Sequence, residues 1–155
     1  MADSLTKIDP GLGLGLIRFG MLAEDVEKLL GPPDEILTSD EDDEGEEINT
    51  RTYVYNEPHL LELNFDGDEE DKLISILIEN PEAELFGEEL IGKTEEDARA
   101  AVLQAGHEVE IWEGPDLREL SIEDLEITLW VEQNLVYAIE WGPFWEDEET
   151  IQWPE

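Results

Sequence analysis

The sequence predicts an α+β fold: a tandem repeat of one helix plus three antiparallel strands, with the helices packed on one face of an antiparallel sheet. Three observations lead to this prediction. The segments 20–26 and 92–98 lie 72 residues apart and share a glycine, a Glu-Asp pair and an apolar residue at the same offsets. Each segment begins a stretch with helical periodicity, and three strand-like runs follow each helix.

The first repeat contains a short helix from Met21 to Leu30, in which apolar residues recur every three or four positions. Gly31 and the two prolines after it end this helix, because glycine suits a left-handed cap and proline cannot continue the hydrogen-bond ladder. The strand-like runs that follow are 52–55, 61–65 and 73–78. The turn signal Asp-Gly-Asp between the last two predicts an antiparallel hairpin.

In the second repeat, Thr94 has the residue type and position of a helix N-cap, with Asp97 three residues later. We expect its helix to end at Gly106. The runs 108–112, 127–131 and 135–141 are strand-like, and the pair Gln133-Asn134 joins the last two in a tight turn. At the start of the first repeat, before its helix, the alternating glycines of 11–20 predict a loose extended entry. They lack the context of a phosphate-binding loop.

The chain is expected to form a single domain, residues 1–155, made of two repeats at about 11–80 and 88–145 and an aromatic, acidic C-terminal tail. Leu, Ile, Val and Phe together account for 44 of the 155 residues. That share is above the level at which a chain cannot build a core, so the composition indicates a folded protein.

The charge is the strongest feature of the composition. The chain has 44 Asp and Glu against 8 Lys and Arg, a net charge of -36. This excess argues against direct binding to nucleic acid or to an anionic membrane, since both attract clustered cations. It favours a basic protein partner. The absence of cysteine suits a reducing compartment, and no segment resembles a signal peptide or membrane span, so a cytoplasmic location is expected.

The motif Phe19-Gly20-Met21, Val26, Leu29-Leu30-Gly31 and Pro33 resembles the opening of the repeat in the β-lactamase inhibitory protein-like superfamily, which includes the SmpA/OmlA-type lipoproteins. It is also similar to motifs of bacterial proteins that look like immunity proteins for toxins. The resemblance implies helical elements on an antiparallel sheet with a concave face for a protein partner, and binding without catalysis. The lipid-anchor cysteine, the disulfides and the secretion signal of some members are missing here.

No pattern points to catalysis, a metal or a cofactor. Among 44 carboxylates some pair always lies close together, so neighbouring acids carry little information. The two histidines, His59 and His107, have no ligand partner at helical spacing and are expected in turns or caps. The acidic run 66–71 lacks the length and terminal glutamate of a calcium loop, which leaves weak, nonspecific cation binding as the expectation.

The candidate partner-binding residues come from the polar side of the predicted sheet, where tryptophans alternate with acids. Large rings among polar groups are typical of interface hot spots, and surrounding acids select a basic partner. The tail and the acidic loop add further candidates. The full set is Glu62, Asn64, Glu108, Glu110, Trp112, Trp130, Glu132, Trp145, Asp40, Asp42 and Asp43. An alternative left open is that the tail or a second copy of the chain covers these rings.

The function predicted from these features is that of an acidic inhibitor or immunity protein, which neutralises a basic toxin such as a nuclease by occluding its active or substrate-binding surface. The alternative is an acidic protein adapted to solubility or high salt, with a structural or interaction role and no inhibitory one. The sequence does not fix the oligomeric state or the identity of the target.

Overall fold

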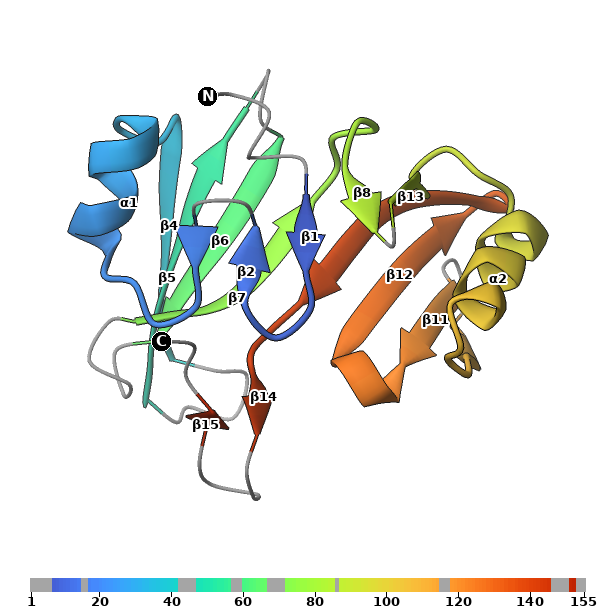
Figure 1. Ribbon diagram of the computed structural model, residues 1–155. Coiled ribbons are helices and arrows are strands. Elements are labelled where there is room, and N and C mark those ends of the chain that lie inside the picture. Colours follow the sequence, from blue (N-terminus) through green and yellow to red (C-terminus); the bar gives the residue numbers. More distant parts are fainter. Residues whose placement is uncertain are drawn as a thin grey trace.

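In the computed structural model, the fold is built on one antiparallel sheet of eight strands in the order β10-β11-β12-β13-β7-β6-β5-β4 (Figure 1). The structure describes residues 7–14, 17–41, 47–56, 60–66, 72–85, 87–114, 118–145 and 151–152. The sheet strands are β4 (Glu35–Glu41), β5 (Glu47–Tyr55), β6 (Leu61–Asp66), β7 (Lys72–Ile78), β10 (Glu110–Glu113), β11 (Arg118–Ile122), β12 (Ile127–Glu132) and β13 (Leu135–Trp141).

Short elements complete the described chain. Two helices, α1 (Ala23–Leu30) and α2 (Glu95–Gln104), each precede four strands of the large sheet, and a single 3-10 turn spans Glu123–Leu125. The small strands are β1 (Ile8–Asp9), β2 (Gly13–Leu14), β3 (Ile17–Arg18), β8 (Glu84–Leu85), β9 (Glu88–Glu89), β14 (Phe144–Trp145) and β15 (Ile151–Gln152). They form one three-stranded ribbon and two two-stranded ribbons.

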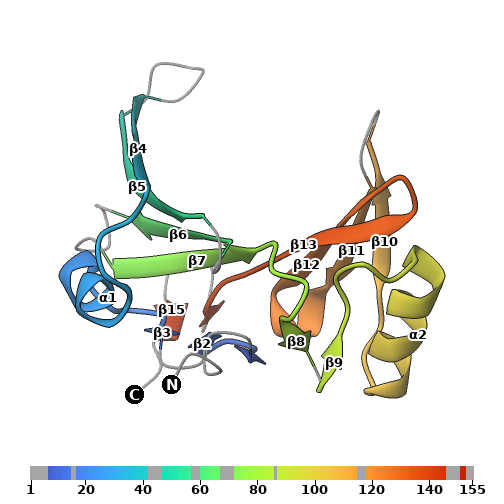
Figure 2. The ribbon, with the colours of Figure 1, turned by 90° about the horizontal axis from the view of Figure 1, so that it is seen from above.

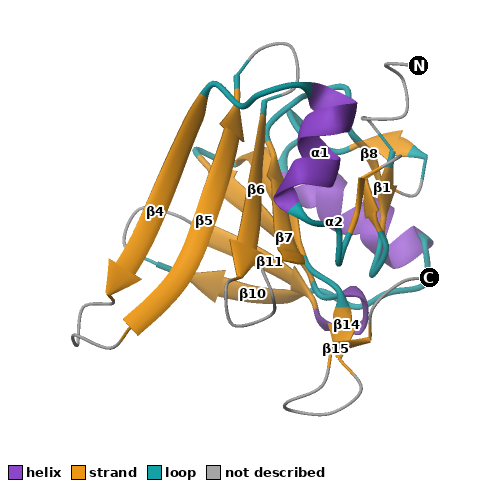
Figure 3. Ribbon diagram, turned by 90° about the vertical axis from the view of Figure 1, so that its left-hand side faces the viewer, coloured by secondary structure: helices purple, strands orange, loops and turns teal. Residues whose placement is uncertain are grey.

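The hydrophobic core lies between the large sheet and a mixed layer of helices and ribbons. Cross-strand rows such as Tyr55, Leu61, Ile78, Ile139, Leu129 and Leu120 supply the sheet side of the core, and all of these are buried. In Figure 3 the helices and the β1 and β8 ribbons stand on one side of the sheet, and the other side is bare. We call the covered side the helix side and the bare side the open face.

The predicted fold class, an α+β tandem repeat of one helix plus three strands with helices packed on the sheet, is wrong. The chain is mostly β, with eight strands in one sheet and two short helices. The physical reason lies in the helices, because α1 buries only Ala23 and Val26, and α2 only Ala98, Ala101 and Val102. Such narrow apolar stripes cannot cover eight strands. Ribbon and loop residues complete the layer, including Ile8, Leu14, Ile17, Phe19, Leu85 and Leu90.

The predictions for the helix cap, the helix end and the hairpin turn of the second half are confirmed. The side chain of Thr94 caps α2, since its Oγ1 accepts a hydrogen bond of 3.2 Å from the Asp97 amide. Gly106 ends this helix with a φ of 94°. The turn between β12 and β13 has positive φ at both Gln133 and Asn134, which is the type I′ geometry of a tight hairpin. The glycine-rich entry, expected to be loose, instead pairs as β1, β2 and β3.

The open face is concave because the sheet bends at both ends. Seen from above in Figure 2, β4 and β5 rise on one side of β6 and β7, and the β10-β11 pair rises on the other. Register irregularities between β6 and β7 and between β12 and β13 accompany this bend. The middle strands therefore form the floor of the concave face, and the two edge pairs form its walls.

Among the described residues, no helix is long and apolar enough to cross a membrane.

Candidate functional site

A single row of residues crosses the open face along all eight strands. In register order it consists of Glu35, Val54, Glu62, Leu77, Glu140, Thr128, Ser121 and Glu110. Residues paired across neighbouring strands project from the same face, so these eight side chains share the open face. Four of the eight are glutamates. The row therefore places negative charge at both walls and on the floor of the concave face.

A ladder of side-chain hydrogen bonds runs over the floor beside this row. Thr52 donates to the Asn64 amide oxygen at 2.5 Å, and the Asn64 amide nitrogen donates to Ser75 Oγ at 3.3 Å. Ser75 in turn donates to Glu140 at 3.4 Å, and the indole of Trp130 donates to the other Glu140 oxygen at 3.2 Å. The ladder joins strands β5, β6, β7, β13 and β12. Because each member of this ladder has a hydrogen-bond partner, these side chains hold one another in place.

Two tryptophans and one acid form the next row toward the β10 wall. Trp112 on β10 stands opposite Glu119 on β11, and Glu119 stands opposite Trp130 on β12. Trp112 is 60% exposed, whereas Trp130 is half-buried and tied to Glu140. The open face thus offers one fixed ring and one ring that is available to a partner.

Cations are almost excluded from the open face. All eight Lys and Arg residues lie in the described part of the chain. Lys72 alone among them has an open-face register, opposite Asp66. Arg51 and Arg118 stand opposite the buried residues Phe65 and Val131, on the helix side, and Arg118 bonds Glu95 of α2. The remaining cations belong to the helices, the β3 strand or neighbouring loops: Lys7, Arg18, Lys28, Lys93 and Arg99.

The carboxylates on the floor affect one another. Burial raises the pKa of Glu62 above its ordinary value, and the charges of Glu79 and Glu140 raise it further. Burial is also the main cause of the raised pKa of the half-buried Tyr137, with contributions from Glu132, Glu79 and Glu140. Both shifts disfavour additional negative charge.

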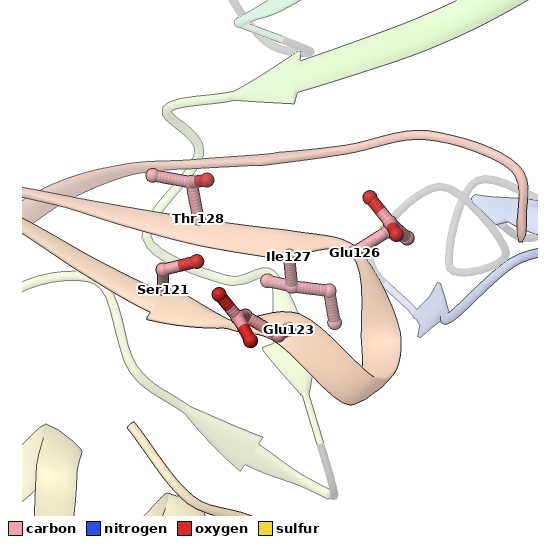
Figure 4. Close-up of a pocket in the computed structure, with 5 residues that line it drawn as sticks. All are labelled: Ser121, Glu123, Glu126, Ile127 and Thr128. Atoms are coloured by element: carbon pink, nitrogen blue, oxygen red, sulfur yellow. The ribbon is translucent and has the colours of Figure 1, made fainter. Parts of the chain in front are cut away.

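A solvent-open pocket of about 410 Å³ lies at the end of β11 and β12 (Figure 4). Its lining residues are Ser121, Glu123, Glu126, Ile127 and Thr128. Glu110 shares a hydrogen bond with Glu123 at this end of the sheet, and that bond is the main cause of its raised pKa, followed by the charge of Glu123. Within the described ranges, no group of three or more His, Asp or Glu is arranged to hold a metal ion.

The structure brings together part of the predicted partner-binding set. The residues on the open face are Glu62, Asn64, Glu110, Trp112 and Trp130. Glu132 ends β12 and is exposed, and Glu108 is exposed in the segment before β10. Asp40 falls in β4, although its side chain is not described. Asp42, Asp43 and also His59 lie outside the described residues.

The described strands of the tail, β14 and β15, lie away from this face (Figure 2). β14 and β15 lie on the helix side in Figure 2, where Pro143 bridges to Gly11 and a Cβ on Gly11 would overlap the Phe144 ring. Trp145, in β14, is therefore not brought beside Trp112 and Trp130. The described tail strands, β14 and β15, do not cover these two rings (Figure 2).

Sequence reasoning missed several residues of the open face. Glu140, Ser75, Thr52 and Glu119 complete the hydrogen-bond ladder and the tryptophan row. Glu140 alternates with the buried residues Ile139 and Trp141 on its strand, which was a usable signal. Glu119 had none, because β11 was not predicted as a strand.

The comparisons with known proteins leave the family open. No family model matches the chain, and no curated protein matches it. Among solved structures, an extracellular protein containing a SCP domain from Bacillus anthracis str. Ames is similar, with a TM-score of 0.49 and 10% sequence identity. The match covers 80% of this chain and 43% of that one, so the chain spans less than half of that structure's length. A likeness this low carries no functional argument.

Proposed function

We propose that the chain is a non-catalytic, acidic inhibitor or immunity protein that binds a basic protein, such as a nuclease toxin, through the open face. One observation carries the proposal. A concave sheet face holds a row with four glutamates, two tryptophans beside it, and one lysine at its end among the described residues. The resemblance of the motif at 19–33 to the β-lactamase inhibitory protein-like superfamily supports the same kind of function, protein binding without catalysis. A cytoplasmic location is part of the same proposal.

The proposed mechanism is occlusion. The carboxylates of Glu62, Glu119 and Glu140 occupy positions that nucleic-acid phosphates take on a basic enzyme, and Trp112 anchors the contact by burying a large ring. The hydrogen-bond ladder lowers the cost of binding, because the floor is already ordered before the partner arrives. Long-range attraction from the net charge of -36 speeds the encounter and makes it sensitive to salt.

The test compares two double variants with the same change in charge. Glu62→Lys with Glu119→Lys alters the open face, and Glu88→Lys with Glu89→Lys alters exposed acids of β9 on the helix side. Each is titrated against a basic ribonuclease, with the association rate and inhibition measured from low to high salt. The open-face variant should lose about tenfold or more in affinity, because it places cations against the basic partner. The β9 variant should lose only the smaller part of the affinity that depends on the overall net charge.

Equal losses in the two variants would show that only the overall charge matters and would overturn the open face as the binding surface. An association rate that does not change with salt would remove the electrostatic part of the mechanism. Circular dichroism of each variant confirms that the comparison is made between folded proteins.

A further inference from the structure

The β10 strand forms one edge of the large sheet, and no strand of the described residues pairs with its outer side. It pairs with β11 through four consecutive residues in regular register, from Glu110 opposite Ser121 to Glu113 opposite Arg118. It is the last strand in the sheet order, and no backbone hydrogen bond from β10 to an element other than β11 occurs among the described residues. All four of its side chains are exposed, including the large apolar residues Ile111 at 37% and Trp112 at 60%.

Natural proteins usually protect such an edge with lysine, proline or a bulge, because unpaired amides and carbonyls invite another strand. The opposite edge, β4, has an irregular register between Ser39 and Glu41. The β10 segment, Glu-Ile-Trp-Glu, has no lysine, proline or bulge, and its protection consists of its length of four residues and its two glutamates. It carries glutamate at both ends, which repels an acidic strand and accepts a basic one.

The charges decide which strand fits this edge. A second copy pairing β10 antiparallel to itself places Glu110 against Glu113, and it also joins two chains of charge -36. Like charges directly opposite each other on neighbouring strands are destabilising, whereas opposite charges and aromatic-aliphatic pairs stabilise the sheet. The occupant that fits is therefore basic at the two ends and apolar between them.

We infer that β10 is a docking edge for an extended basic segment of a partner, with Lys or Arg opposite Glu110 and Glu113 and apolar residues opposite Ile111 and Trp112. The segment adds a ninth strand to the sheet by backbone hydrogen bonds. Its motif is basic-apolar-apolar-basic, and the same order fits either strand direction. This inference rests on the proposed basic partner and specifies one part of it.

The arrangement around β10 supports this occupant. A residue added beside Trp112 extends the row that continues through Glu119 and Trp130, so an apolar or guanidinium group there contacts a large exposed ring. A cation beside Glu110 also neutralises the carboxyl pair that Glu110 forms with Glu123. Glu113 already pairs with Arg118, so a cation of the added strand contributes more opposite Glu110 than opposite Glu113.

The experiment uses a capped eight-residue peptide, TVKVVRTV, as the probe. Binding is measured by titration calorimetry, and amide hydrogen exchange is followed by NMR on the full chain. We expect the β10 amides to exchange about tenfold or more slowly at saturation, because outward amides gain acceptors, while the β4 amides stay unchanged. Two versions of the peptide are N-methylated at one of the two central valines, the fourth or the fifth residue. Each keeps the charge and loses one amide donor. Because neighbouring amides point to opposite sides of a strand, the version methylated on the side of β10 should bind about tenfold more weakly.

Matched variants compare β10 with a site away from the open face. Glu110→Lys and Glu88→Lys make the same charge change at two exposed glutamates, of which only Glu110 belongs to β10. The first should weaken peptide binding about tenfold, and the second should change it less than about twofold, because only the first lies opposite the peptide. Both positions are exposed, so both variants are expected to fold.

Three results would overturn the inference: no binding of the peptide, equal binding of both N-methylated peptides without protection at β10, or a dimer in sedimentation that protects β10 without peptide. None of them decides the proposed function, since that is tested on Glu62 and Glu119 with a folded basic protein. If the unmodified chain does not bind the folded basic protein but the peptide still protects β10, then the edge captures basic strands and the open face does not bind the partner.

Discussion

At the scale of single residues, cross-strand register separates tryptophans of different roles. Trp141 stands opposite Ile76 and Ile127 on the helix side, is 2% exposed, and donates its indole hydrogen to the Gly13 carbonyl at 3.1 Å. Trp112 stands opposite Glu119 and is mostly exposed. Trp141 thus fastens the N-terminal ribbon to the sheet, and Trp112 is available for binding. Sequence alternation identified the polar setting of Trp112, but it did not locate the ribbon carbonyl, which is 128 residues away in the chain.

Glu62 gives a prediction on pH. Its folded pKa lies above the ordinary value of 4.5 because of burial and of the charges of Glu79 and Glu140, so its ionised form destabilises the native state at neutral pH. Glu62→Gln should therefore raise the free energy of unfolding at pH 7. The advantage is full above the raised pKa and disappears as the pH falls to 4.5, since the native state then binds the proton. Urea unfolding from pH 7 to 4.5 measures it.

The control for this prediction is Glu88→Gln, which removes an exposed carboxylate of β9. It should leave the shape of the pH profile almost unchanged. A loss of stability in Glu62→Gln that is constant across this pH range would contradict the prediction, because it would show that the Glu62 carboxylate contributes favourable contacts instead of a charge penalty.

At the scale of elements, the sequence predicted segments with a clear period and missed those interrupted by charge. Both helices and the runs in β5, β6, β7, β12 and β13 were placed correctly, within one or two residues at several boundaries. β4 follows two prolines and enters an acidic stretch, and β11 is a short alternation of two buried residues, Leu120 and Ile122. Side-chain pairing across strands is a long-range property, so the open-face row and the β10 edge became visible only with the sheet order.

Thr94 gives a prediction for α2. Its Oγ1 accepts from the Asp97 amide at 3.2 Å, and this satisfies one of the unpaired donors at the helix start. Thr94→Ala should lower the free energy of unfolding by about 1 kcal/mol, whereas Thr94→Ser keeps the oxygen and should lose much less. Chemical denaturation of the unmodified chain and the two variants measures the three free energies of unfolding. Equal losses in the two variants would assign the effect to the threonine methyl group and not to the cap.

At the scale of the whole molecule, the wrong fold class has a specific cause. The repeated helix motif is present, but the layer that covers the sheet is assembled from ribbon and loop residues such as Ile8, Leu14, Leu85 and Leu90. Elements of two residues have no measurable period, so a sequence pattern cannot assign them to a layer. This layer covers one side of the sheet, and the other side carries the row of Glu35, Glu62, Glu140 and Glu110 across its strands.

The charge also predicts how stability responds to salt, and this separates the binding proposal from salt adaptation. The core contains large, fully buried side chains such as Phe65 and Trp141, so we expect a cooperative fold at about 10 mM salt, where the Debye length is ~30 Å. Screening of the self-repulsion of -36 charges should raise the melting temperature by roughly 2–8 °C by 150 mM. Differential scanning calorimetry in sodium chloride and choline chloride should show the same rise, because screening depends on ionic strength. A chain that unfolds cooperatively only in molar salt would support salt adaptation and weaken the case for an acidic binding face.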